Sequence, residues 1–317
     1  MTGKRKLAVL AIGGNSLIKD KDHQRVTDQF AVTRETCNHI REMIEDGWNV
    51  VVTHGNGPQV GFILRRTELS LKELHPVPLD SIGADTQGSI GYMIQQSLRN
   101  EFSRTGLSNQ VATLVTQVLV DPEDQAFQNP SKPIGSFMDE QTAKKMAEQE
   151  GWDVKEDAGR GWRRVVASPL PKEIVERDAI GALVDSGFVV IAVGGGGIPV
   201  VRHANGDLEG VAAVIDKDYA SALLASRLSA EKFIISTAVD KVYLDFNKPS
   251  QKALDRLTVS EAKKHLEQGQ FPAGSMGPKM QACINFLVGG GEQAIITSPE
   301  NLAPAMRGEA GTIIDRD

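Results

Sequence analysis

Asp216, Lys217 and Asp218 place two carboxylates and one ammonium side by side in the sequence. An apolar segment, 210–215, precedes them, and an amphipathic helical pattern, 219–225, follows at once. A helix N-terminus offers free backbone N–H groups and a dipole that favours anions, and a lysine there adds a compact positive charge. The arrangement suits a phosphoryl group. A capping aspartate with solvated neighbours is the alternative interpretation of the same pattern.

Two loops rich in glycine and asparagine follow two early apolar runs, 7–12 and 49–53. Glycine lets the backbone approach a small anion, and an amide side chain can donate to it. Either loop alone could be an ordinary tight turn, but two of them favour anion binding. We interpret His54, which precedes the second loop, as structural. The candidate substrate-binding residues of these loops are Gly13, Gly14, Asn15, Gly55, Asn56 and Gly57.

Two further glycine-rich segments exclude common nucleotide motifs. The run 194–197 is not a dinucleotide fingerprint, because Pro199 stands where the last glycine is required. Gly195 and Gly196 in this run are further candidates for substrate contact. The segment 274–279 places Lys279 in the first turns of a predicted helix, but it lacks the G-K-[ST] ending of a Walker A loop. A solvated surface lysine is the alternative interpretation of Lys279.

Lys132 lies between two prolines in a polar stretch, 121–171, that interrupts the pattern of the rest of the chain. A lysine exposed in a turn is the ordinary interpretation, and a lysine delivered to a site from a lid is the functional one. The stretch is too aromatic for a disordered linker. We predict a small folded excursion that covers a site, with a small core of its own built from aromatic residues. These aromatic residues are Phe127, Phe137, Trp152 and Trp162.

The elements that must position these residues alternate between apolar strands and helices. Strands are predicted at 7–12, 49–53, 111–120, 188–193, 232–237, 294–297 and 311–314. Helices are predicted at 30–44, 60–74, 80–102, 174–186 and 276–288, and a capping box, Thr258 with Glu261, opens another. Continuously apolar strands between helices predict a mostly parallel sheet covered on both faces, with ligands beyond the carboxyl ends of its strands.

Composition excludes several classes of protein. The chain has 317 residues and a net charge of −6, and the absence of a basic block argues against a nucleic-acid partner. No apolar run approaches the roughly 20 residues that span a membrane, and the run 7–12 is too short for a signal peptide, so we expect a cytoplasmic protein. Cys37 and Cys283 lie in helical apolar patterns and are predicted core residues in a reducing compartment. No residue spacing predicts a protein metal site.

Eight segments together resemble the carbamate kinases of the amino acid kinase family. In chain order they are 11–15, 53–61, 87–92, 132–135, 163–169, 194–200, 213–218 and 274–279, and they extend over nearly the whole chain. The resemblance implies a three-layer α/β/α sandwich with a mostly parallel central sheet and a small protruding subdomain at about 121–171. It implies an N-terminal lobe, 1–215, for carbamate or carbamoyl phosphate, and a C-terminal lobe, 216–317, for the nucleotide.

The resemblance also implies an activity and a set of residue roles. The reaction would be reversible phosphoryl transfer between ATP and carbamate, giving ADP and carbamoyl phosphate, with Mg²⁺ accompanying the nucleotide. The enzyme would be a homodimer that makes ATP in arginine or other nitrogen catabolism. Lys217 and Lys279 would hold phosphates, Asp218 would orient these lysines, and Lys132 would contact the carbamoyl end. The candidate nucleotide-binding residues are Lys217, Asp240, Tyr243, Ser275, Met276 and Lys279.

Two positions depart from the wider family. Many relatives carry a lysine two residues before the first loop glycine, where this chain has Ala11. Carbamate kinases supply a lysine from the protruding subdomain instead, which matches Lys132. Ala238 replaces an aspartate common among relatives and leaves the details of the nucleotide pocket open. Two alternatives remain: another acyl-phosphate-forming kinase, and a non-catalytic nucleotide sensor on the same fold.

Overall fold

An eight-stranded sheet forms the centre of the protein. The structure is a computed structural model that describes residues 6–18, 23, 25–157 and 159–317. Within these residues the strand order is β15-β17-β16-β12-β1-β2-β9-β3, and all neighbours are parallel except β16 and β17. The predicted mostly parallel sheet is confirmed. Its strands are β1 (Leu7–Ile12), β2 (Asn49–His54), β3 (Val111–Thr113), β9 (Val189–Ile191), β12 (Lys232–Ser236), β15 (Arg256–Thr258), β16 (Gln293–Thr297) and β17 (Thr312–Asp315).

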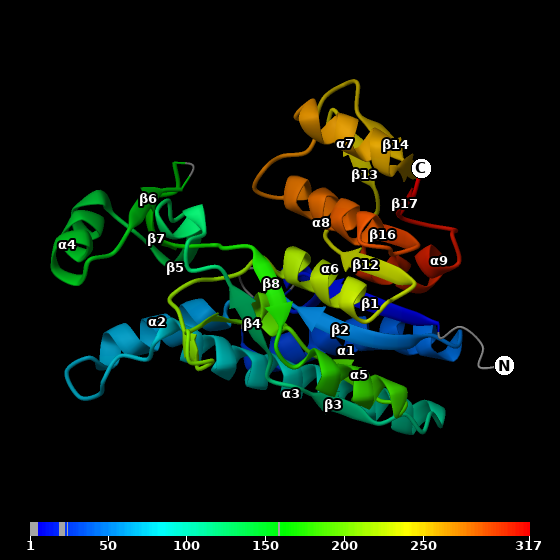
Figure 1. The fold of residues 1–317 in the computed structure, drawn as a ribbon, viewed down its shortest axis with the longest axis horizontal. Coiled ribbons are helices and arrows are strands. Elements are labelled where there is room, and N and C mark those ends of the chain that lie inside the picture. Colours follow the sequence, from blue (N-terminus) through cyan, green and yellow to red (C-terminus); the bar gives the residue numbers. More distant parts are fainter. Residues whose placement is uncertain (1–5, 19–22, 24, 158) are drawn as a thin grey trace.

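Helices cover both sides of this sheet, which confirms the three-layer α/β/α sandwich (Figure 1). One face packs against α1 (Val26–Glu45), α3 (Leu79–Thr105) and α9 (Leu302–Met306). The other packs against α5 (Arg177–Asp185), α6 (Lys217–Arg227), α7 (Val259–Glu267) and α8 (Met276–Val288). The capping box predicted from Thr258 and Glu261 is present at the start of α7.

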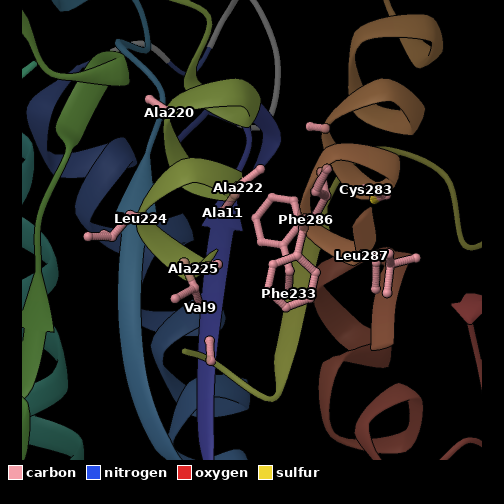
Figure 2. Packing of buried hydrophobic residues seen from close by; sticks show 14 of the residues in the cluster. Val9, Ala11, Ala220, Ala222, Leu224, Ala225, Phe233, Cys283, Phe286 and Leu287 are labelled. Atoms are coloured by element: carbon pink, nitrogen blue, oxygen red, sulfur yellow. The ribbon is translucent and has the colours of Figure 1, made fainter. Parts of the chain in front are cut away.

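Small side chains of α6 and a large one of α8 cover neighbouring strands of the sheet. Figure 2 shows Ala222 and Ala225 of α6 close to Val9 and Ala11 of β1, while Phe286 of α8 meets Phe233 of β12. The two phenylalanine rings lie 5.6 Å apart, centroid to centroid. Alanines allow α6 to approach the sheet closely, and this packing fixes the position of its N-terminus at the carboxyl ends of the strands.

Within the described residues, two smaller sheets and a two-stranded hairpin accompany the main sheet. The first contains β4 (Gln117–Val120), β8 (Pro171–Ile174), β10 (Ile198–Arg202) and β11 (Leu208–Gly210). The second contains β5 (Lys132–Met138), β6 (Val154–Glu156) and β7 (Trp162–Val166). With α4 (Glu140–Glu150) it stands away from the main sheet, beside α2 (Gln59–Ser70), at the left of Figure 1. The remaining elements are the hairpin β13 (Val242–Leu244) with β14 (Lys252–Leu254), and the short turns η1 (Gly14–Ser16), η2 (Gln125–Phe127), η3 (Gly194–Gly196) and η4 (Pro299–Asn301).

Several predicted elements have other boundaries in the structure. The helix predicted at 60–74 ends at Ser70, and the helix predicted at 30–44 begins at Val26. The single strand predicted at 111–120 is two strands, β3 and β4, in different sheets. Between them, the buried Gln87 side chain of α3 binds both the N–H and the C=O of Thr116, which turns the chain out of the main sheet. The helix predicted from 174 begins at Arg177, because residues 171–174 pair with β4 as β8.

The prediction of an aromatic core inside the excursion was also wrong. Phe137 remains 47% exposed, and the Arg160 and Arg163 guanidiniums lie over its ring. Trp152 is covered in the same way by Arg164. The buried apolar residues of β5 and β7 instead join a cluster with α2 and α3. Cation–π contacts therefore replace the predicted packing of aromatic rings against one another.

No helix among the described residues is both long and apolar enough to cross a membrane. Cys37 and Cys283 are buried and free, which confirms their interpretation as core residues.

Candidate active site

A cavity of about 770 Å³ lies where the loop after β2 meets the N-termini of α6 and α8 and the start of β5. It is at the carboxyl ends of the central parallel strands, where open α/β sheets bind their ligands. Its wall contains glycines, which expose their backbone, and polar or charged side chains. These residues are Gly55, Asn56, Gly57, Arg65, Lys132, Ser136, Arg163, Gly195, Asp216, Lys217, Asp218, Ser275 and Lys279.

Asp218 is the centre of a charged cluster in this wall. Its Oδ1 accepts a hydrogen bond from Lys217, and its Oδ2 accepts one from Lys279 at 2.8 Å. Lys217 is the first residue of α6 and Lys279 lies in the first turn of α8, so the packing of these two helices brings the three side chains together. Only 4% of the Asp218 side chain is exposed, and the two lysines are also largely buried.

The electrostatics of the cluster stabilise its charged form. Burial alone would raise the pKa of Asp218, but the Lys217 and Lys279 ammoniums outweigh it and lower that pKa to about 2. Burial lowers the pKa of Lys217, and the neighbouring Asp218 carboxylate opposes this change. When both lysines are protonated, the cluster carries one net positive charge beside two helix N-termini, which favours a phosphate.

Lys132 reaches the same cavity from the small sheet beside α2. Its Nζ lies 3.1 Å from Oδ2 of Asp216, 84 residues away in the sequence. Asp216 is also the N-cap of α6, because its Oδ1 accepts a hydrogen bond from the backbone N–H of Asp218 at 2.9 Å. One carboxylate therefore connects the lysine of β5 with the helix that carries Lys217.

Close backbone packing explains two glycines of the run 194–197. Gly195 has φ +68°, and a Cβ there would overlap the Asn56 side chain. Gly196 has φ +95°, and a Cβ there would overlap the backbone of Ile215. Both positions require glycine, for conformation and for space. The run thus packs directly against the β2 loop and against the segment that leads into α6.

His54 is buried under the site and remains neutral. Burial and the nearby Lys217 ammonium together lower its pKa to about 4, although the hydrogen bond with Gly55 opposes them. The neutral ring donates from Nδ1 to the Gly55 carbonyl oxygen, 2.8 Å away. This contact fixes the start of the β2 loop, in keeping with a structural role.

The structure brings part of the predicted site together. Gly13, Gly14, Gly196, Met276, Asp240 and Tyr243 are absent from the cavity wall, among the described residues that form it. Gly13 packs against the Ser236 carbonyl of β12, and Tyr243 donates to Asp240 at 2.7 Å at the surface. The side chain of Asn15 lies outside the described part of the structure.

Sequence reasoning missed three charged residues of the cavity wall. Asp216 was part of the noted Asp-Lys-Asp run but was not chosen as a site residue. Arg163 lies in one of the segments that carry the resemblance, and it donates to the Gly135 carbonyl at 3.1 Å. Arg65 lies on α2, where no motif surrounds it. Only the first two gave a signal that could have been used.

A sequence model of the Amino acid kinase family matches residues 6–298. The chain belongs to the amino acid kinase family. Curated members similar to it include a carbamate kinase of Clostridium perfringens, 50% identical over 311 residues that cover 96% of this chain and 98% of that protein. A carbamate kinase-like protein of Escherichia coli, YahI, is 50% identical over 313 residues, covering 98% and 99%.

A solved structure supports the same assignment. The carbamate kinase from Giardia lamblia bound to AMP-PNP has a TM-score of 0.94 and 42% sequence identity, with full coverage of both chains. Because the coverage is complete, the likeness extends over the main sheet and the small sheet that carries Lys132. The family resemblance inferred from the eight segments is confirmed.

Proposed function

We propose that this protein is a carbamate kinase, which transfers a phosphoryl group reversibly between ATP and carbamate, giving ADP and carbamoyl phosphate. The observation that carries the proposal is that Lys132, Lys217 and Lys279 reach one cavity from three separate elements. Relatives named carbamate kinase at up to 50% identity, and a 42% identical carbamate kinase bound to AMP-PNP, support it.

The proposed mechanism relies on position and charge. Phosphoryl transfer spreads negative charge over the moving group, so preorganised cations do most of the catalysis. Lys217 and Lys279 would bind the nucleotide phosphates and the moving group, and Asp218 would keep both ammoniums in place. Lys132 would hold the carbamoyl end of the second substrate. The backbone N–H groups of Asn56 and Gly57 would add neutral donors to the anion, whereas that of Gly55 already donates to the Ile12 carbonyl.

The two substrates would approach from opposite walls of the cavity. We propose that residues 1–215, with the protruding segment at about 121–171, bind carbamate, and that residues 216–317 bind the nucleotide. Ser275 and Met276 open α8 and would contact a phosphate through the Ser275 hydroxyl and the Met276 N–H. The Gly277 N–H already donates to the Pro272 carbonyl, and Pro278 has no N–H. Asp240 and Tyr243 remain predictions for the part of the nucleotide outside this cavity.

Magnesium fits this site as a companion of the nucleotide. The described residues contain no group of three His, Cys, Asp or Glu side chains that could hold a metal ion by themselves. Mg²⁺ typically keeps several waters and binds substrate phosphates with few protein ligands. It would neutralise phosphate charge there, while the lysines orient the reacting groups.

We also propose that the enzyme is a cytoplasmic homodimer that serves ATP synthesis in arginine or other nitrogen catabolism. The support is the resemblance to carbamate kinases alone. Analytical ultracentrifugation of the purified protein measures the assembly directly, and a single monomer species at micromolar concentration would contradict it.

A coupled assay tests the activity. Folded protein with ADP and Mg²⁺ is offered carbamoyl phosphate, and ATP formation is followed through hexokinase and glucose-6-phosphate dehydrogenase. We expect rapid ATP formation from carbamoyl phosphate and slower formation from acetyl phosphate. A preference for the phosphorylated carboxylate of an amino acid would show another acyl-phosphate kinase. Nucleotide binding without turnover of any acyl phosphate would show a sensor.

A further inference from the structure

Two carboxylates, among the described residues, line the cavity: Asp216 and Asp218. Every oxygen of the two carboxylates has a partner, and the two side chains differ in exposure. Both oxygens of Asp218 accept from lysine ammoniums, and its side chain is 4% exposed. The Asp216 side chain is 21% exposed, and its Oδ2 faces the 36% exposed Lys132 at 3.1 Å. Asp216 is therefore the carboxylate that a ligand in the cavity can reach.

Carbamate and carbamoyl phosphate have a chemical feature that similar acyl compounds lack. The carbamoyl group presents a carbonyl oxygen, which accepts a hydrogen bond, next to an NH₂ group, which donates. Acetyl phosphate has the same shape, but a methyl group replaces the NH₂. A site that selects the carbamoyl group needs a hydrogen-bond acceptor for this NH₂, because the NH₂ makes a hydrogen bond there that a methyl group cannot make.

We propose that Asp216 determines specificity by accepting a hydrogen bond from the NH₂ of the carbamoyl group through its Oδ2. Lys132 stands beside it and donates to the neighbouring carbamoyl oxygen. The ammonium and the carboxylate form a donor and acceptor pair that complements the acceptor and donor pair of the substrate. This inference rests on the proposed function, and it assigns that function's selectivity to one oxygen atom.

The capping role of Asp216 makes a clean test possible. Its Oδ1 accepts from the Asp218 N–H. In an Asp216→Asn variant the amide oxygen keeps this cap, since asparagine caps helices as well as aspartate does. The amide NH₂ then occupies the place of Oδ2 and turns towards the substrate NH₂ and Lys132. The acceptor becomes a donor while the helix start is preserved.

The experiment compares two substrates in the full-length protein with Mg²⁺ and ADP. For Asp216→Asn we expect kcat/KM with carbamoyl phosphate to fall about 10- to 100-fold, the size typical of a lost hydrogen bond to a charged group. The kcat/KM with acetyl phosphate, the slower substrate, should change by no more than about threefold, because its methyl group makes no such bond. The selectivity of the enzyme for carbamoyl phosphate over acetyl phosphate should therefore fall by about the same factor as kcat/KM with carbamoyl phosphate.

Controls separate this inference from a structural effect and from the proposed function. Asp121→Asn removes the same charge and an ion pair with Lys172 outside the cavity, and it should leave both constants unchanged. Lys132→Ala should weaken both substrates together, since both offer a carbonyl oxygen. Equal losses for the two substrates in Asp216→Asn, or no loss for either, would overturn the role of Asp216. Wild-type protein without ATP formation would instead overturn the proposed function.

Discussion

Lys279 donates a hydrogen bond to Asp218 across 61 residues of sequence, at 2.8 Å, in a place where the carboxylate is almost entirely buried. The contact joins the first turn of α8 to the first turn of α6. Because both helices also pack on the sheet through Phe286, Ala222 and Ala225, the spacing of the charged groups is set by the core beneath them (Figure 2).

Removing the charge of Asp218 should disable transfer. In Asp218→Asn the two lysines lose the anion that holds them in place, and we expect kcat to fall about 10²- to 10³-fold, as for other losses of a preorganised electrostatic contact. The coupled assay measures this, with circular dichroism as the check on folding. The matched control is Asp255→Asn, which breaks an exposed pair with Lys241 and should keep normal kcat. A normal kcat in Asp218→Asn would show that the lysines need no such partner.

Lys132→Ala should separate the two substrates. We expect ATP formation to fall about 100-fold or more, because a cation that contacts the reacting group is lost. The affinity for ADP, measured by calorimetry, should remain within about twofold, since Lys132 reaches the cavity from the side of β5. Lys172→Ala removes an exposed lysine of β8 and serves as the control. Loss of ADP binding with carbamoyl phosphate use retained would assign Lys132 to the wrong ligand.

His54 should make the protein less stable in mild acid. An unfolded histidine binds its proton near pH 6.5, whereas the folded His54 remains neutral until about pH 4. Between these values the unfolded state binds more protons, so the free energy of unfolding falls as the pH is lowered through this window, by roughly 3 kcal/mol in total. Denaturant titrations from pH 7 to pH 4.5 measure this dependence.

The matching variant of this prediction is His54→Gln, which cannot titrate. Its free energy of unfolding should depend less steeply on pH than that of the wild type. Equal slopes for the wild type and His54→Gln would show that His54 does not contribute to the acid sensitivity.

Thiol reagents should not inactivate the native protein. Burial raises the pKa of both Cys37 and Cys283, so neither presents a reactive thiolate. An aromatic disulfide reagent should label neither cysteine in the folded protein within minutes and both after denaturation. Fast labelling of the native protein would show that the core around α1 or α8 opens readily.

Local sequence patterns were sufficient where local chemistry decides the structure. The apolar runs at 7–12 and 49–53 became β1 and β2 almost residue for residue, and Thr258 with Glu261 capped α7. The sequence did not predict that the strand ends after Thr113. Gln87, 29 residues away from Thr116, binds Thr116 and redirects the backbone. No local pattern contains that contact.

The same limit applies to the candidate site. The Asp-Lys-Asp run and the segment around Lys279 indicated a phosphate site, but their meeting at Asp218 depends on the packing of α6 against α8. The pairing of Lys132 with Asp216 spans 84 residues. Arg65 lies in the cavity wall, but no motif surrounds it. The sequence of a helix does not distinguish an arginine that faces a cavity from one that faces solvent.

The measurement that tests the central claim most directly is the rate of ATP formation from carbamoyl phosphate and ADP for the wild type and for Lys217→Ala. Lys217 sits at the start of α6, against Gly55 and Asp218, with its ammonium in the wall of the cavity. We predict steady turnover by the wild type with Mg²⁺, and a rate at least about 100-fold lower in the folded variant at saturating substrates. A near-normal rate in Lys217→Ala, or no ATP from the folded wild type, would contradict the account.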